Sequence, residues 1–188
     1  MPNMKEDLRI QKTKRAIEEA FLELVTEKDF SSVKVTEIAE RAEVNRNTIY
    51  LHYSSKEGIV SKIVERTFAQ EFNEMDINDF IKVGSKKEAK RLFTLVYQVL
   101  LKNERAYRLI LADSSMAGHM MLTVRSLSFL NIDSIADNPQ NQVVFDYILN
   151  GVFGVAQKWF MYDQKENEHN IDVLADLFIA NIRKLKRS

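Results

Sequence analysis

A short stretch beginning at Arg46 carries side chains whose chemistry suits the edges of DNA bases. Arginine can form two hydrogen bonds with guanine in a major groove, and asparagine can do the same with adenine. Arg46, Asn47 and Tyr50 fall on one polar side of a helix that the spacing predicts at about residues 46–52. A helix presenting these three side chains together has the groups needed to read a base sequence.

Side chains suited to phosphate lie in and around the same stretch. Thr48, Tyr50, His52 and Lys56 offer hydroxyl, imidazole and ammonium donors. Lys56 also stands at the expected start of a helix, where the helix dipole favours an anion. Residues 1–15 hold five basic and two acidic side chains, a net charge of +3. Such an arm suits phosphate contact, although an ordinary solvated helix start explains it equally well.

Two short helices with a three-residue connection would position these side chains. Segment 34–53 (KVTEIAERAEVNRNTIYLHY) predicts helices at about 35–42 and 46–52, with Asn45 as the N-cap of the second. Ala39 is small enough to let the helices cross closely, and Ile49 supplies an inward apolar contact. This pattern describes a helix-turn-helix, although its spacing alone equally fits two bundle helices with a solvated face.

The rest of the chain is also expected to be helical. Only 5 Gly and 2 Pro occur, and this scarcity of helix breakers favours long helices. We therefore predict an all-α protein with an N-terminal helix-turn-helix DNA-binding domain (1–74) and a C-terminal helical bundle for effector binding and dimerisation (75–188). Apolar spacing predicts further helices at about 7–28, 56–73, from 86 onward, 104–113, 116–131, 141–162 and 171–186, with a linker at 74–85 and a loop at 133–141.

Composition excludes several classes of protein. The chain has no Cys, which rules out a disulfide scaffold, a zinc–thiolate site and cysteine catalysis. We find no H-x-x-x-H pair, nucleophile elbow or glycine-rich phosphate loop, so we expect no enzyme activity, cofactor or metal. No signal peptide and no apolar run of about 18 residues is visible, which fits a cytoplasmic protein without a membrane partner. The net charge is zero, so any case for DNA rests on local arrangement.

Segment 38–57 (IAERAEVNRNTIYLHYSSKE) resembles the N-terminal domain of the TetR (tetracycline repressor-like) family. That family's pattern is roughly I-A-x-x-A-G-V-S-x-x-T-x-Y-x-H-F-x-x-K-x-x-L, and its most specific part is T-x-Y-x-H-[FY]-x-x-K. The resemblance covers about residues 9–66. Carried over by position, it implies DNA contacts by Thr36, Arg46, Asn47, Thr48, Tyr50, His52 and Lys56.

Two positions depart from that pattern. Glu43 stands in the turn where Gly is usual, and a positive φ there would strain the backbone by about 1 kcal/mol. Lys34 replaces the Thr that usually caps the first motif helix, and an ammonium group cannot accept a backbone N–H bond. Ser32 or Thr36 could substitute as the cap, so the start of this helix stays open.

The resemblance implies that the C-terminal half forms a homodimer. Two long apolar-faced helices at a chain end often pair with their symmetry copies, although a plain intramolecular bundle face is the alternative. Gly151 and Gly154 lie in mid-helix at a cost of about 1 kcal/mol each, which close helix approach or a kink beside a cavity could offset. The expected interface residues are Phe145, Ile148, Val152, Val155, Trp159, Leu174, Phe178 and Ile182.

The resemblance also implies a small effector, and the central helices carry flexible and aromatic side chains that could receive it. An apolar or aromatic compound would suit them, with Tyr97, Tyr107, Arg108 or His119 as polar handles. The same residues equally fit a plain core. The expected pocket residues are Phe68, Phe72, Phe93, Tyr97, Tyr107, Met116 and Met120.

We therefore expect a transcription regulator that binds a palindromic operator in double-stranded DNA as a homodimer. A ligand-responsive repressor is the first hypothesis. The alternatives are an activator or co-regulator controlled by a protein partner, and a helical adaptor that has lost DNA binding. The operator sequence, target genes and effector are not readable from the sequence.

Overall fold

A computed structural model describes residues 4–72, 84–126, 139–161 and 167–185 of the chain. Within these ranges all regular structure is helical, which confirms the predicted all-α fold class. No helix among the described residues is both long enough and apolar enough to cross a membrane. The elements are α1 (Met4–Glu27), the 3-10 turn η1 (Phe30–Ser32), α2 (Val35–Arg41), α3 (Arg46–His52), α4 (Lys56–Phe72), α6 (Lys86–Lys102), α7 (Glu104–Ala112), α8 (Ser114–Ser126), α10 (Pro139–Met161) and α11 (Asn167–Leu185).

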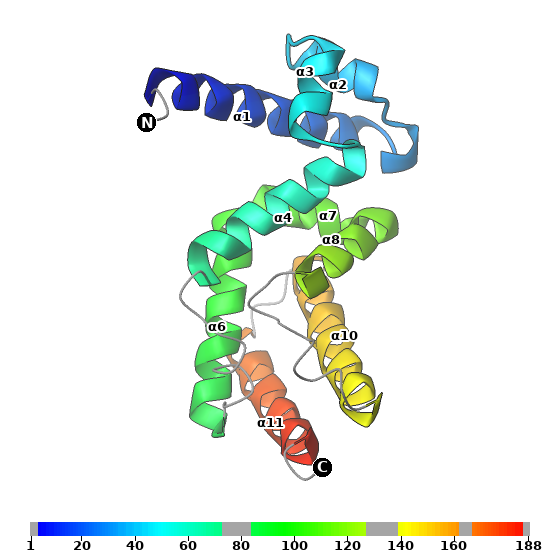
Figure 1. Ribbon diagram of the computed structural model, residues 1–188. Coiled ribbons are helices and arrows are strands. Elements are labelled where there is room, and N and C mark those ends of the chain that lie inside the picture. Colours follow the sequence, from blue (N-terminus) through cyan, green and yellow to red (C-terminus); the bar gives the residue numbers. More distant parts are fainter. Residues whose placement is uncertain (1–3, 73–83, 127–138, 162–166, 186–188) are drawn as a thin grey trace.

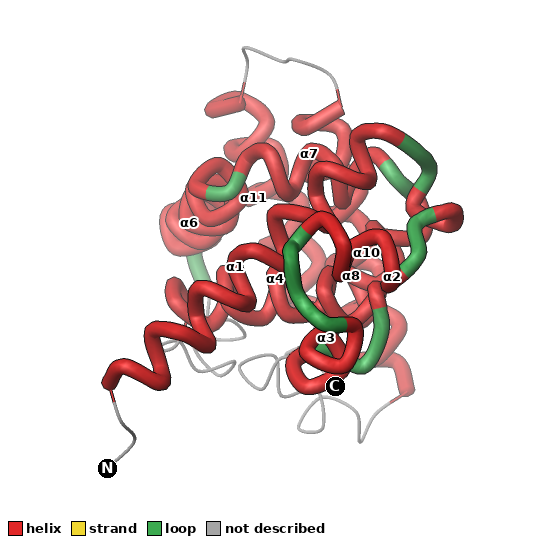
Figure 2. Tube along the Cα trace, turned by 90° about the horizontal axis from the view of Figure 1, so that it is seen from above, coloured by secondary structure: helices red, strands yellow, loops and turns green. Residues whose placement is uncertain are grey.

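The helices form an upper and a lower group joined by α4 (Figure 1). Helix α1 runs across the top, with α2 and α3 packed beside its C-terminal half, and its N-terminal end projects away from the other helices (Figures 1 and 2). Helix α4 descends from this layer and packs against α8, while α11 packs against α6 and α10. The upper group thus carries the predicted helix-turn-helix at one end of the molecule.

Local capping explains where several helices begin. The Asn45 side chain accepts a hydrogen bond from the Asn47 N–H (2.8 Å), which confirms it as the N-cap of α3. The Ser55 hydroxyl accepts a hydrogen bond from the Gly58 N–H (3.2 Å) at the start of α4. Ser85 and Glu88 form a reciprocal capping box at the start of α6.

Some predicted boundaries were wrong. Pro139, which we placed in a loop, is the first residue of α10, because its fixed φ and missing N–H suit a first helical turn. Helix α11 begins at Asn167, four residues before the predicted start. Helix α8 ends at Ser126 among the described residues, and its predicted continuation to 131 lies outside them. Residues 73–83, which include the predicted domain boundary, also lie outside the described part.

The buried apolar residues form one cluster that runs from α1 to α11. Helix α1 contributes Ile17 and Phe21, whose ring packs edge-on against Phe30 at 6.0 Å between centroids. Full burial of such side chains stabilises the fold by about 1.5–3 kcal/mol each. Helix α4 contributes Ile59 and Ile63 and lies between the two groups, so it belongs to both.

Candidate nucleic-acid interface

The turn between α2 and α3 contains a non-glycine residue in the left-handed backbone region. Glu43 has φ 54°, so the condition under which we expected strain at this position is met. Its N–H donates to the Glu40 carbonyl oxygen (3.2 Å), and the Val44 N–H donates to the Ala39 carbonyl oxygen (3.0 Å). A left-handed conformation costs a residue with a Cβ about 1–2 kcal/mol. The fold carries this strain in the turn that sets the angle between the two helices.

The start of α2 is stabilised by a carboxylate instead of a hydroxyl cap. Glu37 accepts a hydrogen bond from the Lys34 backbone N–H (2.9 Å) and pairs with the Lys28 ammonium group (2.5 Å). These hydrogen bonds lower the pKa of Glu37. Among the described residues, the cap comes from Glu37 and from neither Ser32 nor Thr36, so α2 starts at Val35 despite the unsuitable Lys34 side chain.

The three predicted base-reading side chains share the exposed side of α3. Arg46, Asn47 and Tyr50 are exposed, while Ile49 on the opposite side is fully buried. An Arg46 guanidinium N–H donates to the Tyr50 hydroxyl (3.1 Å), and the guanidinium carbon lies 5.4 Å from the Tyr50 ring centroid. This pair restricts the long arginine side chain before any ligand arrives. The geometry is compatible with the predicted base contacts, which stay predictions.

Leu51 is a residue of α3 that our sequence reasoning missed. It is 80% exposed and lies four residues after Asn47, so both side chains stand on the same side of the helix. An apolar residue at helical spacing from a polar contact residue was the signal that could have found it.

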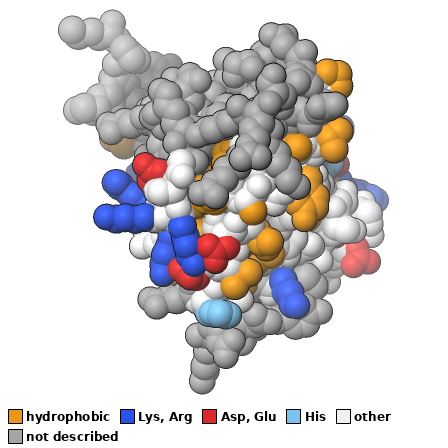
Figure 3. Space-filling view, turned by 90° about the horizontal axis from the view of Figure 1, so that it is seen from below, with side chains coloured by type: hydrophobic (Ala, Val, Ile, Leu, Met, Phe, Trp, Pro, Cys, Tyr) orange, Lys and Arg blue, Asp and Glu red, His pale blue; other side chains and the backbone are white. Residues whose placement is uncertain are grey.

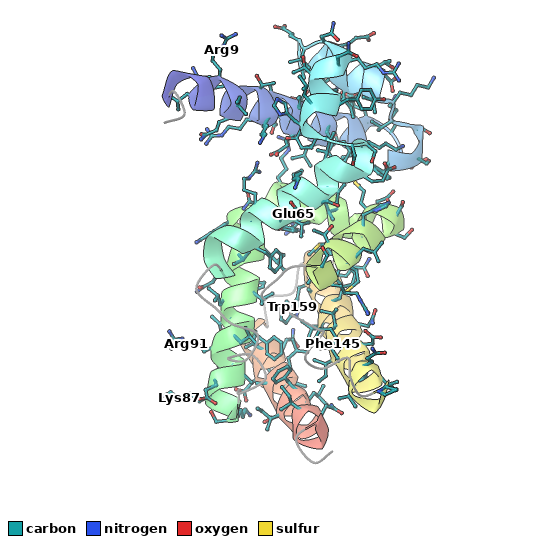
Figure 4. The ribbon with its side chains drawn as sticks, in the orientation of Figure 1. Arg9, Glu65, Lys87, Arg91, Phe145 and Trp159 are labelled. Carbon is teal, nitrogen blue, oxygen red and sulfur yellow. The ribbon has the colours of Figure 1, made fainter. Side chains whose placement is uncertain are left out.

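The predicted phosphate contacts lie around this helix. Thr36 is exposed in the first turn of α2, and Thr48 and His52 are half-buried. Burial, and then the positive charge of Lys14, lower the pKa of His52. Arg9 points into solvent from the projecting part of α1 (Figure 4), and Lys12, Lys14 and Arg15 are exposed as well.

Lys56 is engaged within the protein itself. Its ammonium group donates to the backbone carbonyl oxygens of Phe30 (2.7 Å), Ser31 (3.0 Å) and Val33 (3.1 Å). It also lies 4.5 Å from the Phe30 ring centroid. An ammonium group has three donors, and this arrangement occupies all of them. Lys56 therefore fastens the segment between α1 and α2 to the start of α4, and its predicted phosphate contact would require it to leave these carbonyls.

A buried carboxylate fixes the far end of α3. Glu18 of α1 is 7% exposed and accepts a hydrogen bond from the Tyr53 hydroxyl (3.0 Å) and another from Arg66 of α4 (2.7 Å). Burial and the Glu18 charge raise the pKa of Tyr53. Our sequence reasoning missed Glu18, although a carboxylate directly after Ile17 on the apolar side of α1 was a usable signal.

The predicted ligand-pocket residues lie in the core of the lower group. Phe68, Phe93, Tyr107, Met116 and Met120 are buried, and the Phe93 ring packs edge-on against Phe178 at 5.5 Å between centroids. Tyr97 is half-buried and packs edge-on against Trp159 at 5.3 Å. The Phe72 side chain lies outside the described residues. This placement fits both a core and the wall of a ligand site, so the pocket stays a prediction.

The predicted dimer residues lie mostly inside a single chain. Phe145 and Trp159 of α10 point inward (Figure 4). Val152 and Val155 are half-buried and, with Ile148, Leu174 and Phe178, line a groove of about 180 Å³ between α10 and α11. The buried members of the predicted set are Phe145, Ile148, Trp159, Leu174, Phe178 and Ile182.

Other apolar side chains of α10 and α11 face solvent. Val143 is 69%, Tyr147 65%, Val173 44% and Leu177 55% exposed. Seen from below, the described surface carries apolar side chains gathered beside charged ones (Figure 3). These exposed residues are the part of α10 and α11 that a second subunit could cover.

A metal site finds no support in the described residues, among which no group of three His, Cys, Asp or Glu side chains could hold an ion.

The exposed polar face of α3, its strained turn and its fixed ends together define a helix-turn-helix protein.

The comparisons with known proteins agree with this class. The model of the family "Bacterial regulatory proteins, tetR family" matches residues 17–63, which run from Ile17 in α1 to Ile63 in α4. A relative from Bacillus subtilis (strain 168), the "Uncharacterized HTH-type transcriptional regulator YxbF", is 27% identical over 95 residues, which are 50% of this chain. The match spans only 25% of that relative's own length.

Solved structures share the overall fold at low sequence identity. A TetR transcriptional regulator from Rhodococcus sp. RHA1 has a TM-score of 0.56 at 21% identity, covering 91% of this chain and 98% of its own. The transcriptional regulator FadR from Bacillus subtilis, solved in complex with stearoyl-CoA, has a TM-score of 0.54 at 19% identity. The match covers 89% of this chain and 96% of the FadR chain. Residues 17–63, which hold the helix-turn-helix, thus match the tetR family of bacterial regulatory proteins, and the whole chain shares the fold of solved regulators of that kind.

Proposed function

We propose that this chain is a ligand-responsive repressor that binds a palindromic operator as a homodimer in the cytoplasm. The observation that carries this proposal is the exposed face of α3, where Arg46, Asn47 and Tyr50 stand together on a helix whose two ends are fixed by Asn45 and Tyr53. A two-fold dimer would present two such helices about 34 Å apart, in successive major grooves. The N-terminal domain (1–74) would bind DNA, and the remainder (75–188) would bind the effector and the second subunit.

Operator binding tests this proposal. DNA selected from random duplexes by the full-length protein should contain an inverted repeat. Arg46→Ala should weaken binding to it by about 1–3 kcal/mol and relax the preference at one base position per half-site. Arg108→Ala, which removes an exposed arginine of α7, is the matched control and should bind as wild type does. Failure to select any sequence would contradict the proposal.

The second subunit would cover the exposed side of α10 and α11. Tyr147 and Leu177 flank the apolar groove between these helices and are 65% and 55% exposed. Gly151 lies on the same groove, and a Cβ added there would meet nothing within 4 Å. Close approach within one chain therefore does not explain this glycine. A symmetry-related helix seated against Gly151 would explain both the missing side chain and the exposed apolar residues.

The effector would enter the lower group near Trp159. This residue is 8% exposed, and its indole N–H finds no acceptor among the described residues. A buried unpaired donor costs about 1–3 kcal/mol. A ligand with an apolar body and a carbonyl acceptor would pair the indole N–H while contacting Tyr97 and the surrounding core. Because a FadR of similar fold was solved with stearoyl-CoA, long-chain acyl-CoA is the first compound to test.

Trp159 is the chain's single tryptophan, so its fluorescence reports directly on this region. Adding stearoyl-CoA should change the emission and release the operator at the same concentrations, because linkage makes the coupling reciprocal. Trp159→Phe keeps an aromatic ring but loses the N–H. It should therefore bind DNA normally and require about threefold to tenfold more ligand for release. Operator release without any change in Trp159 emission would place the effector elsewhere.

A further inference from the structure

We propose that Leu51 is a specificity-determining residue that packs on the 5-methyl group of a thymine in the operator. This inference rests on the proposed function, because it requires α3 to enter the major groove. It adds an apolar contact to the polar ones already described, and it assigns that contact to a residue absent from the predicted set.

The exposure of Leu51 is not explained by the fold. Its side chain is 80% exposed, whereas Ile49, two residues earlier, is fully buried and fills the inner side of the same helix. Single exposed apolar side chains are common on protein surfaces, so exposure alone assigns nothing. What distinguishes Leu51 is its position relative to the other exposed residues of α3.

Four exposed side chains make up what we call the α3 face: Arg46, Asn47, Tyr50 and Leu51. Residues four apart on a helix are neighbours, so Arg46 stands beside Tyr50 and Asn47 beside Leu51. The first pair is joined by a hydrogen bond of 3.1 Å. In the second pair, an amide lies about one helical turn from an apolar group, on the exposed side of α3.

The chemistry of this second pair matches an A·T-containing sequence. An asparagine amide pairs with the N6 and N7 groups of adenine, and thymine presents its C5-methyl group in the same groove. Leucine has no hydrogen-bonding group and therefore cannot bind phosphate. The thymine methyl is the apolar feature of the B-DNA major groove that a leucine can cover. We infer that Asn47 and Leu51 read neighbouring base pairs, the first by hydrogen bonds and the second by burial of the methyl group.

Replacing thymine by deoxyuridine tests the contact, because it removes the methyl group and keeps the base-pairing edge. The operator is first selected with the full-length protein, and each thymine is then replaced in turn. Wild-type protein should bind about fourfold more weakly at one position in each half-site, the loss expected for one buried methyl group. Leu51→Ala should bind the thymine and deoxyuridine duplexes equally at that position and keep its discrimination elsewhere. Leu51→Met, which keeps an apolar side chain of similar length, should retain most of the preference for the thymine duplex over the deoxyuridine duplex.

Leu122→Ala is the matched control, because Leu122 is 64% exposed on α8 and lies outside the α3 face. It should show the wild-type deoxyuridine profile. Equal binding of every deoxyuridine duplex by wild type would overturn the inference while leaving the proposed function intact. An unchanged profile in Leu51→Ala would do the same. If no duplex is selected at all, the proposed function fails, and this inference fails with it.

Discussion

The exposed face of α3 and the exposed face of α10 and α11 differ in the chemistry they offer a partner. On α3, Arg46, Asn47 and Tyr50 carry hydrogen-bonding groups. On α10 and α11, Tyr147 and Leu177 present mainly apolar surface beside a groove. The first suits base edges and phosphates, and the second suits another protein surface. One neutral chain can therefore serve two unlike partners, because its surface groups are separated in space.

The two regions also differ in how their helices are fixed. Polar side chains anchor α3 and its neighbours, through Glu18 to Tyr53 and through Lys56 to three carbonyls. Helix α11 packs through buried apolar residues, and its ion pairs to α6 are exposed, including those of Lys86 with Asp172 (2.7 Å) and Asp176 (2.8 Å). Directional hydrogen bonds hold one geometry, whereas apolar packing tolerates small sliding. The contrast suits the two roles that we propose, a rigid reading helix in the first region and a response to ligand in the second.

The largest expected effect comes from charging the apolar face. Leu177→Asp should convert the dimer to monomers, because burying an unpaired carboxylate costs several kcal/mol. Light scattering should show half the wild-type mass at micromolar concentration, and operator affinity should fall more than tenfold with the loss of the second half-site. Leu122→Asp is the control at another exposed leucine, on α8, and should stay dimeric. A wild-type protein that is already monomeric would contradict the proposed interface.

An intermediate effect is expected from removing the Lys56 ammonium group. Lys56→Ala leaves three carbonyls without their donor and should lower the free energy of unfolding by about 1–3 kcal/mol in urea titrations. Lys62→Ala, which removes an exposed lysine of the same helix, should change it by less than about 0.5 kcal/mol. The salt dependence of operator binding separates the two roles of Lys56. A salt-dependence slope reduced by about one in Lys56→Ala would show that this ammonium group also contacts a phosphate. An unchanged free energy of unfolding would contradict the role of Lys56 in holding the segment between α1 and α2 against α4.

The smallest effect should be a gain. Glu43→Gly removes the Cβ from a left-handed residue and should stabilise the fold by about 1 kcal/mol, measured as a higher Tm. Glu40→Gly, three residues earlier within α2, should instead destabilise by about 1 kcal/mol, because glycine is unfavourable in a helix interior. Opposite signs at these two glutamates would show that the turn, and not the composition of the segment, carries the strain. Stability changes of the same sign at both positions would contradict the assignment of the strain to the turn.

The sequence predicted the upper group well because local signals specify it. Asn45 caps α3 and Glu43 turns the chain, and both effects depend only on neighbours in sequence. The inward apolar contact predicted for Ile49 is also observed, since this side chain is fully buried. By contrast, the anchors of α3 depend on distant residues: Glu18 meets Tyr53, 35 residues away, and Lys56 meets Phe30, 26 residues away. No periodicity encodes such pairs.

The packing of the lower group was harder to predict, because it also depends on residues that are distant in the sequence. Apolar spacing identified α10 and α11 but could not tell which apolar side meets the core and which meets solvent. Phe145 and Phe178 turned inward, while Tyr147 and Leu177 faced outward on the same helices. A helix with apolar residues on two sides leaves that choice to tertiary packing. The interface prediction therefore needed the three-dimensional arrangement.

The position of α4 has a consequence for how the protein melts. Ile59 and Ile63 belong to the same continuous core as Ile17, and the Ser61 hydroxyl accepts a hydrogen bond from Thr123 of α8 (2.8 Å). Because α4 packs in both groups of helices, neither group can unfold alone without exposing part of the shared core to water. Calorimetry should accordingly record one heat-absorption peak whose van't Hoff and calorimetric enthalpies agree for each subunit. A fragment cut after α4 would leave the side of that helix that packs on α8 open to water, and it should be prone to aggregation.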